Sequence, residues 1–325
     1  MAYSVILVDV FNLFYRKQNT EDKNPIVKAA NCIKFIEKTI RKELGAKGKL
    51  YLIFDPLPKH DYGYSNKFSY TNIRSEIDPG YKKNRKHDPC VQESVRLIRE
   101  FYKYRGPNVI SVYGDGFEAD DFVESIVKLE AGKKTALFTT DMDWARYLSP
   151  KTDLINKSFS NPYTVKNFEK DFHYYPTITT VSLYKAFYGD ESDNIVGVRN
   201  LPKVKFMSIY DVDDLFMKTL ALYRNKTLAE FCEDIKSLNS AAVIKKTDKN
   251  VFEWFYVALE SALGGKVIPL THLLDNIRVI KSRCKDASEY FHSFEENEKA
   301  NKLIEAVVGI SKDKKQFKFG GLSLS

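Results

Sequence analysis

Hydrophobic and polar positions change their spacing several times along the first half of the chain. Short apolar runs typical of buried strands occupy residues 4–10, 49–55, 108–113, 134–140 and 152–157. Between them, the segments around 26–44 and 91–104 have the apolar spacing of amphipathic helices. Strands rich in Val, Ile, Leu and Phe that alternate with helices predict an α/β fold, with a mostly parallel central sheet flanked by helices.

The strand pattern fades after about residue 180, where helical spacing takes over. We therefore expect an α/β core over residues 1–178 and a helical C-terminal region over residues 179–311. Residues 312–325 are basic at first and end in GGLSLS, which predicts a flexible tail.

Acidic residues follow four of the predicted strands. They are Asp9, Asp55, the group Glu118, Asp120 and Asp121, and the pair Asp141 and Asp143. Because the C-terminal ends of parallel strands lie along one edge of a sheet, we expect these carboxylates to converge. Any single acid could instead cap a turn or a helix, as Asp55 could before Pro56. Their recurrence after successive strands favours a shared site.

Carboxylates gathered in one place repel one another and raise each other's pKa values unless cations neutralise them. Oxygen ligands without His or Cys favour Mg²⁺ or Mn²⁺ over zinc. A pair of such ions can activate water and stabilise the leaving oxygen in phosphodiester cleavage. The sequence therefore predicts a site for two or more divalent ions, Mg²⁺ with Mn²⁺ as a substitute.

The charge of the chain suits a polyanionic partner. The chain has 51 Lys and Arg against 43 Asp and Glu, a formal net charge of +8, which fits nucleic acid or an anionic membrane but also occurs without either. No apolar run reaches the roughly 18 residues of a membrane span, and the N-terminus lacks a basic leader, so we expect no membrane partner. Four separated cysteines without CxxC spacing indicate a reduced, cytoplasmic setting.

Six segments, in chain order, resemble the motifs of the 5′-nuclease family: ILVDVFNLFYR, IFDP, GYKKNR, FEADD, TTDMDWARYL and GDESDNIVGV. The family includes flap endonucleases, the 5′-exonuclease domain of bacterial DNA polymerase I and phage RNase H-type nucleases. The resemblance covers roughly residues 4–220 and implies a PIN-like core with a helical arch or clamp at about 58–105. The absence of a recognisable polymerase region suggests a stand-alone nuclease, and the divergent second half fits a phage-like member. We expect a monomer. The resemblance also implies a metal-dependent, structure-selective 5′–3′ exonuclease or flap endonuclease. The expected substrates are DNA with 5′ single-stranded ends or flaps and RNA–DNA hybrids, in replication, RNA-primer removal or repair.

The resemblance also assigns the acids to two metal sites, and GDESDNIVGV completes the set. One metal is expected mainly among Asp9, Asp55, Glu118 and Asp120; the second mainly among Asp141, Asp143, Asp190 and Asp193; and Asp121 is a further acid of the cluster. Setting these nine aside leaves 34 of the 43 acidic residues against 51 basic ones, a net charge of +17 around the site.

Basic and aromatic residues are expected to contact the nucleic acid. By resemblance, Lys82, Arg85 and Arg16 are catalytic residues: Lys82 and Arg85 lie at the base of the arch, and Arg16 faces a phosphate. The other residues expected to bind nucleic acid are Arg74, Tyr81, Lys83, Lys203 and Lys205. The sequence leaves open whether Tyr81 stacks on a base or packs within its loop.

One segment departs from the family pattern. After GDESDNIVGV, family members continue through a Gly-rich hairpin between two helices, which grips duplex DNA and often holds a potassium ion. This chain reads RNLPKVKFMSIYD instead, which implies a divergent form of the element at about residues 186–220 and leaves the potassium site open. Lys203 and Lys205 could still meet phosphates as point charges.

Two other functions remain open at this point. A PIN-type ribonuclease also gathers acids at strand ends, although the Asp190 and Asp193 motif and the YKKNR segment argue against it. A catalytically inactive nucleic-acid-binding protein of the same fold is expected to lack part of the acid set, and every expected acid is present. The tail, with Phe317 and Phe319, could bind a replication protein.

Overall fold

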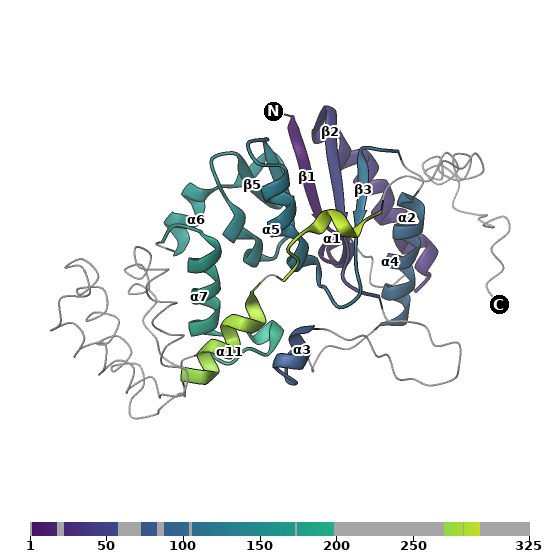
Figure 1. Cartoon of the computed structure of the whole chain (residues 1–325). Helices are drawn as coiled ribbons and strands as arrows, with labels where there is room; N and C mark the ends of the chain where they lie inside the picture. Colours follow the sequence, from purple (N-terminus) through teal and green to yellow (C-terminus); the bar gives the residue numbers. More distant parts are fainter. Residues whose placement is uncertain are drawn as a thin grey trace, which may run out of the picture.

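We describe the protein from a computed structural model (Figure 1). The structure describes residues 2–17, 23–57, 73–82, 88–103, 106–172, 174–197, 270–281 and 283–292. Residues 58–72, 83–87 and 104–105 of the predicted arch lie outside these ranges, as do the part of the predicted duplex-binding element beyond residue 197 and the tail. Among the described residues, no helix is long and apolar enough to cross a membrane.

A seven-stranded mixed sheet forms the centre of the described structure, in the order β6-β5-β4-β1-β2-β3-β7. The strands are β1 (Tyr3–Asp9), β2 (Leu44–Ile53), β3 (Val109–Val112), β4 (Thr135–Phe138), β5 (Thr152–Ser158), β6 (Asn161–Tyr163) and β7 (Phe291–His292). Strands β1 to β5 pair in parallel, whereas β6 and β7 pair antiparallel at the two edges. The predicted mostly parallel sheet is confirmed, and the two short edge strands were not predicted.

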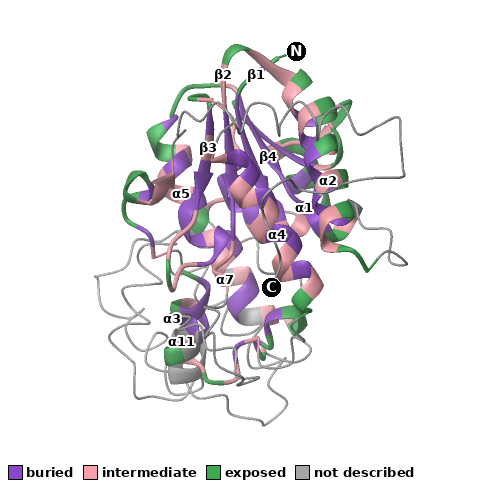
Figure 2. Cartoon of the chain, turned by 90° about the vertical axis from the view of Figure 1, so that its right-hand side faces the viewer, coloured by how far each residue is buried: buried purple, intermediate pink, exposed green. Residues whose placement is uncertain are grey.

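Successive residues of β1 point to opposite faces of the sheet, as the period of a strand requires. Val5 and Leu7 pack with one set of buried residues, and Ile6 and Val8 pack with another. This double burial explains the unbroken apolar run in the sequence, and Figure 2 shows the buried strands between the helical layers.

Helices cover both faces of the sheet. The α-helices among the described residues are α1 (Val10–Lys17), α2 (Pro25–Phe35), α3 (Ile73–Ile77), α4 (Pro89–Tyr102), α5 (Ala119–Leu129), α6 (Val165–Phe172), α7 (Ile178–Tyr188) and α11 (Leu270–Ile280). Side chains of α1, α2 and α4 pack on one face, and those of α5, α6 and α7 pack on the other. The helix expected over residues 26–44 is shorter, because α2 continues into a π-helical turn (Ile36–Ile40) and a 3₁₀ turn (Arg41–Glu43) before β2 begins.

The starts of α2 and α4 follow from local sequence. Asn24 and Asp88 are the N-caps, and their side chains accept hydrogen bonds from the backbone N–H groups of Ile26 and Cys90. Each cap precedes a proline at the first helical position, where a missing N–H costs nothing.

The last part of the described chain returns to the sheet. Helix α11 lies beside α7 and α3 (Figure 1), and Asn276 donates to the backbone carbonyl oxygens of Ala186 and Val196. Residues 283–292, which we call the C-terminal segment, then pass along α5 and end in β7, which pairs with β3. This C-terminal segment therefore completes one edge of the sheet.

Candidate metal centre

The acids after β1 and β2 lie at the C-terminal edge of the sheet. Asp9, the last residue of β1, accepts hydrogen bonds from the Asn12 backbone N–H and from the Thr139 hydroxyl after β4. Asp55 accepts from the backbone N–H of Ala119, the first residue of α5, at 2.8 Å. The bond from Thr139 links the ends of β1 and β4, and the bond from Ala119 links the end of β2 to the start of α5.

The pKa values of Asp9 and Asp55 reflect this crowding. Burial and then the charge of Asp55 raise the pKa of Asp9 to about 7. Burial raises the pKa of Asp55 to about 6, although the charge of Lys82 opposes the increase. Such mutual repulsion is expected of carboxylates that lie close together, although these two are 46 positions apart in sequence.

Two groups of three carboxylates stand out among the described residues. In each group the oxygens lie within 4.8 Å of one another: Asp120, Asp141 and Asp143 form the first, and Asp143, Asp190 and Asp193 form the second. Asp143 belongs to both. The donors are all carboxylate oxygens, which is the ligand chemistry that hard divalent cations prefer, so the residues fit such ions.

Hydrogen bonds hold the three chain segments that supply these acids, around Asp120, Asp141 and Asp190. Asp141 caps the 3₁₀ helix Met142–Tyr147 by accepting from the Asp143 backbone N–H. Trp144, which is completely buried, donates its indole N–H to Oδ1 of Asp120 at 2.6 Å. Asp190 caps the short 3₁₀ helix Glu191–Asp193, and Asn194 closes that turn in the left-handed region, with φ 59°.

Buried cations balance much of the negative charge. The Lys185 ammonium group contacts the carboxylates of Asp143, Asp190 and Asp193, the last two at 2.8 Å. These charges hold the pKa of Lys185 well above its ordinary value despite burial. Lys82 donates to Oε2 of Glu118 at 2.7 Å. The charges of Lys82 and Arg74 lower the pKa of Glu118 against the effect of burial.

Comparison with known proteins identifies the family. The family model described as "5′-3′ exonuclease, N-terminal resolvase-like domain" matches residues 4–173, which is more than half of the chain. The chain belongs to this 5′-3′ exonuclease family. The matched region contains Asp9, Asp55, Asp120, Asp141 and Asp143, so most of the carboxylate cluster lies in the family's own domain.

Relatives in sequence carry related names. DNA polymerase I of Caldicellulosiruptor bescii is 30% identical over 131 residues, covering 37% of this chain and 15% of that protein. The 5′-3′ exonuclease of Mycoplasma genitalium is 25% identical over 195 residues, covering 55% of this chain and 66% of that protein. The chain thus matches less than two thirds of the length of either exonuclease-family relative.

Solved structures share the fold. A T5 5′-exonuclease with bound zinc ions superposes with a TM-score of 0.52 at 18% identity, covering 94% of this chain and 98% of that one. The bacteriophage T5 D15 flap endonuclease, in a pseudo-enzyme-product complex with DNA and metal ions, superposes with a TM-score of 0.50 at 18% identity, covering 94% and 99%. These likenesses support the assignment of the exonuclease family fold.

The structure brings the predicted acids to one region. Asp120 is close enough to Asp9, Asp55 and Glu118 for its charge to raise their pKa values, and its carboxylate also groups with those of Asp141 and Asp143. The division of ligands between two metals stays a prediction.

Of the basic and aromatic residues predicted to contact nucleic acid, some are buried in the described structure and others lie outside the described ranges. Arg74 and Tyr81 are buried and hydrogen-bonded to Glu118, so Tyr81 packs in this structure rather than offering its ring to a base. Arg16 lies over the Phe138 ring and donates to the backbone carbonyl of Asn156. The residues that lie outside the described ranges are Lys83, Arg85, Lys203 and Lys205.

Sequence reasoning missed three residues of the centre, namely Trp144, Arg146 and Lys185. Arg146 is buried, lies 3.8 Å from the Asp143 carboxylate and donates to the backbone carbonyl oxygens of Asp143 and Ile280. Trp144 and Arg146 both fall within the family motif TTDMDWARYL. So many clustered acids require basic side chains nearby to balance their charge. The sequence did not show which basic residues these would be.

Proposed function

We propose that the protein is a divalent-metal-dependent, structure-selective 5′-nuclease. It hydrolyses phosphodiester bonds of DNA or RNA–DNA hybrids at a 5′ end or at a flap junction. The observation that carries the proposal is the pair of carboxylate groups that share Asp143. Two adjacent oxygen-lined groups with one common member suit a pair of closely spaced ions, and such pairs occur in phosphodiester-cleaving enzymes.

Magnesium is the proposed physiological ion, with Mn²⁺ as a substitute. Asp120, Asp141 and Asp143 would hold one ion, and Asp143, Asp190 and Asp193 would hold the other. When bound, such ions supply a nucleophile at neutral pH and stabilise charge on the scissile phosphate. No potassium site is proposed, because the segment in question lies beyond residue 197.

The chain's own cations complete the proposed site. Lys82 lies against Glu118 at the edge of the carboxylate cluster, with its side chain 14% exposed. This placement suits contact with a phosphate oxygen, where a fixed positive charge stabilises negative charge that develops during cleavage. Arg85, which follows in the same motif, is proposed to act beside Lys82.

Nucleic acid is the proposed partner. The T5 flap endonuclease of similar fold has been solved in a complex with DNA and metal ions. When the nine acids of the centre are set aside, the remaining charged residues of this chain are strongly positive in sum. Arg16, Lys83, Lys203 and Lys205 are proposed to contact the sugar–phosphate backbone, because such contacts position a substrate without reading its sequence. We propose that the protein acts as a monomer in the cytoplasm, in DNA replication or repair.

A substrate panel tests this function. Purified protein is incubated with a 5′-labelled flap, a nicked duplex, an RNA-primed duplex and single-stranded RNA, each with Mg²⁺ or with EDTA. We expect Mg²⁺-dependent cleavage of the flap or the primed duplex, and the product sizes separate junction cutting from stepwise trimming. Cleavage of single-stranded RNA alone would instead indicate a PIN-type ribonuclease. Binding without any cleavage would indicate an inactive protein of the same fold.

A further inference from the structure

Both oxygens of the Asp121 carboxylate accept hydrogen bonds from the protein. Oδ2 accepts from the backbone N–H of Glu118 at 2.9 Å. Oδ1 accepts from Nη2 of Arg74 at 2.9 Å and from the backbone N–H of Arg283 at 3.2 Å. The residue is 1% exposed. Its carboxylate therefore joins three segments: the start of α5, helix α3 and the C-terminal segment.

The neighbouring Asp120 has a different environment. Successive residues of an α-helix point about 100° apart, so the two side chains leave α5 in different directions. Asp120 belongs to the first carboxylate group, whereas Asp121 belongs to neither group found among the described residues. The three N–H donors already use three of the roughly four acceptor positions of the Asp121 carboxylate, so little of it is left for an ion.

Arg74 connects Asp121 to Glu118. The guanidinium group uses Nη2 for Asp121 and Nη1 for Oε2 of Glu118 at 2.5 Å. Nη1 also donates to the hydroxyl of Tyr81 at 3.0 Å. Because the planar guanidinium fixes the angle between its donors, this fork sets the position of one carboxylate relative to the other.

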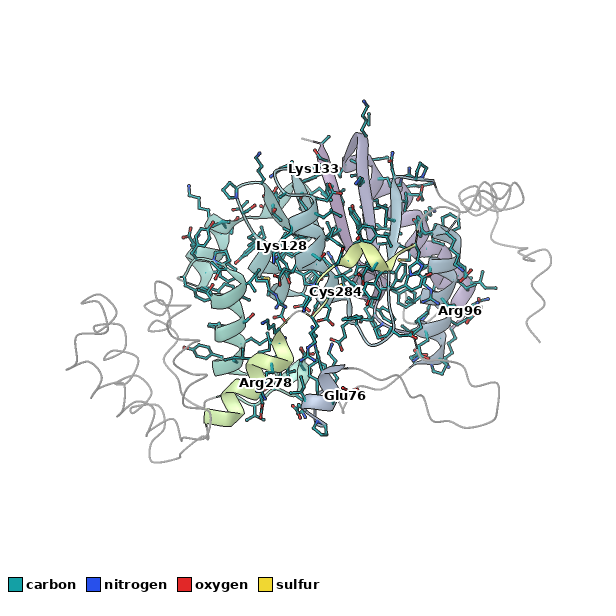
Figure 3. All side chains as sticks on the ribbon, in the orientation of Figure 1. Glu76, Arg96, Lys128, Lys133, Arg278 and Cys284 are labelled. Carbon is teal, nitrogen blue, oxygen red and sulfur yellow. The ribbon has the colours of Figure 1, made fainter. Side chains whose placement is uncertain are left out.

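The C-terminal segment meets the same helix at two further places. Ala287 donates its backbone N–H to the Ser125 hydroxyl at 2.8 Å, one turn beyond Asp121 on α5. The Tyr290 ring packs against the rings of Phe117 and Phe122 with centroid distances of 5.1 and 5.4 Å. Figure 3 shows Cys284, at the start of this segment, in the interior between the sheet layer and α11.

We propose that Asp121 is a positioning residue rather than a metal ligand. It holds Arg74 and the N-terminus of α5, thereby orients Glu118, and anchors the C-terminal segment to the metal centre. This assignment rests on the proposed function for the role of the centre, and it replaces the ligand role that family resemblance implied for Asp121.

A crystal structure of the wild-type protein grown with Mn²⁺ tests the assignment directly. Anomalous scattering locates each ion. We expect ions beside Asp120 and Asp143, none within coordination distance of Asp121, and intact bonds from Asp121 to Arg74 and to the Arg283 N–H. An ion at about 2.2 Å from a carboxylate oxygen of Asp121 would overturn the proposal. This result does not depend on whether the protein cleaves nucleic acid, so the two proposals can fail separately.

Kinetics test the positioning role, with Asp121→Asn, Arg74→Gln, the double variant and Glu124→Gln on the same helix as the matched control. We expect Asp121→Asn to lower kcat by about 10- to 100-fold with little change in KM, and Glu124→Gln to leave both near wild type. If Asp121 acts through Arg74, the double variant is within about threefold of the more damaging single variant. Effects that multiply, or a wild-type kcat in Asp121→Asn, would show that Asp121 does not act through Arg74. Should Asp121→Asn fail to fold, the Mn²⁺ structure still decides.

Discussion

The indole N–H of Trp144 donates a hydrogen bond of 2.6 Å to Oδ1 of Asp120, a member of the first carboxylate group. Trp144 is completely buried, so its fluorescence depends on the protein around it rather than on solvent. An ion bound by Asp120 would withdraw electron density from the oxygen that accepts this bond. The tryptophan is therefore a built-in reporter for the metal centre.

Titration of Mn²⁺ into the protein should change Trp144 emission. The chain has two tryptophans, so the measurement uses a Trp254→Phe background to isolate Trp144. We expect a saturable change whose midpoint matches the Mn²⁺ affinity from calorimetry, and a midpoint at least about tenfold higher in Asp120→Asn. Emission that stays constant while calorimetry shows binding would contradict the placement of Asp120 in the centre.

Replacement of Lys185 should make stability dependent on added metal. Lys185→Met leaves Asp143, Asp190 and Asp193 without the ammonium that contacts them. Breaking a buried ion pair costs about 3–5 kcal/mol, so we expect a loss of that order in the free energy of unfolding in EDTA. Millimolar Mg²⁺ should recover much of it.

The control for Lys185 is Lys128→Met, which removes a pair with Glu124 whose lysine side chain is 70% exposed. Its expected cost is within about 1 kcal/mol. Denaturant unfolding of both variants, in EDTA and in Mg²⁺, provides the comparison. Equal losses in EDTA would mean that Lys185 is not the counter-ion of the second carboxylate group.

A pH effect is expected at the opposite end of the sheet, where Figure 3 labels Lys133. Glu130 accepts hydrogen bonds from Tyr51, Lys49 and Lys133, and these donors lower its pKa to about 2 against the effect of burial. A lowered pKa in the folded state adds stability above pH 4.5, and this stability is lost as the pH falls toward 2.

Glu130→Gln should therefore cost about 1–3 kcal/mol in the free energy of unfolding at pH 7. The difference from wild type should shrink as the pH falls from 4.5 toward 2. Urea unfolding at several pH values measures this difference, with Glu124→Gln as the control. A cost that is the same at pH 7 and near pH 2 would rule out the ionic contribution.

The docking of the C-terminal segment on the core predicts an effect at Gly114. A Cβ atom added there would overlap the ring of Tyr290. Gly114→Ala should destabilise the protein by about 1–3 kcal/mol, because the ring must move. Gly45→Ala is the control, since its Cβ would have ordinary contacts of 3.6 Å or more. Thermal unfolding that ranks the two variants equally would contradict the packing of Tyr290.

The sequence predicted the parallel sheet and the convergence of acids because both follow from local patterns. A buried strand leaves an apolar run, and a residue such as Asp9 or Asp55 after that run must lie at the C-terminal edge. The two-residue strand β7 leaves no such pattern, since its pairing with β3 links positions 179 and 181 residues apart. Its place in the sheet depends on tertiary packing.

The roles of individual charged residues were less predictable. Asp120 and Asp121 are adjacent and chemically identical, yet one groups with other carboxylates and the other binds Arg74 and the Arg283 N–H. Lys185 lies on α7 rather than at the end of a strand, so the pattern of acids after strands did not predict its contact with the centre. Such partnerships depend on side-chain directions in three dimensions, which residue spacing alone does not give.

The most direct test of the metal-dependent nuclease assignment is the cleavage rate of a 5′-labelled flap by wild type and by Asp143→Asn, each with Mg²⁺ and with EDTA. Asp143 is the member that the two carboxylate groups share, so its loss weakens both. We expect wild type to cleave only with Mg²⁺, and Asp143→Asn to be slower by at least about 10²-fold while it remains folded. Undiminished cleavage by Asp143→Asn, or cleavage by wild type in EDTA, would contradict the account.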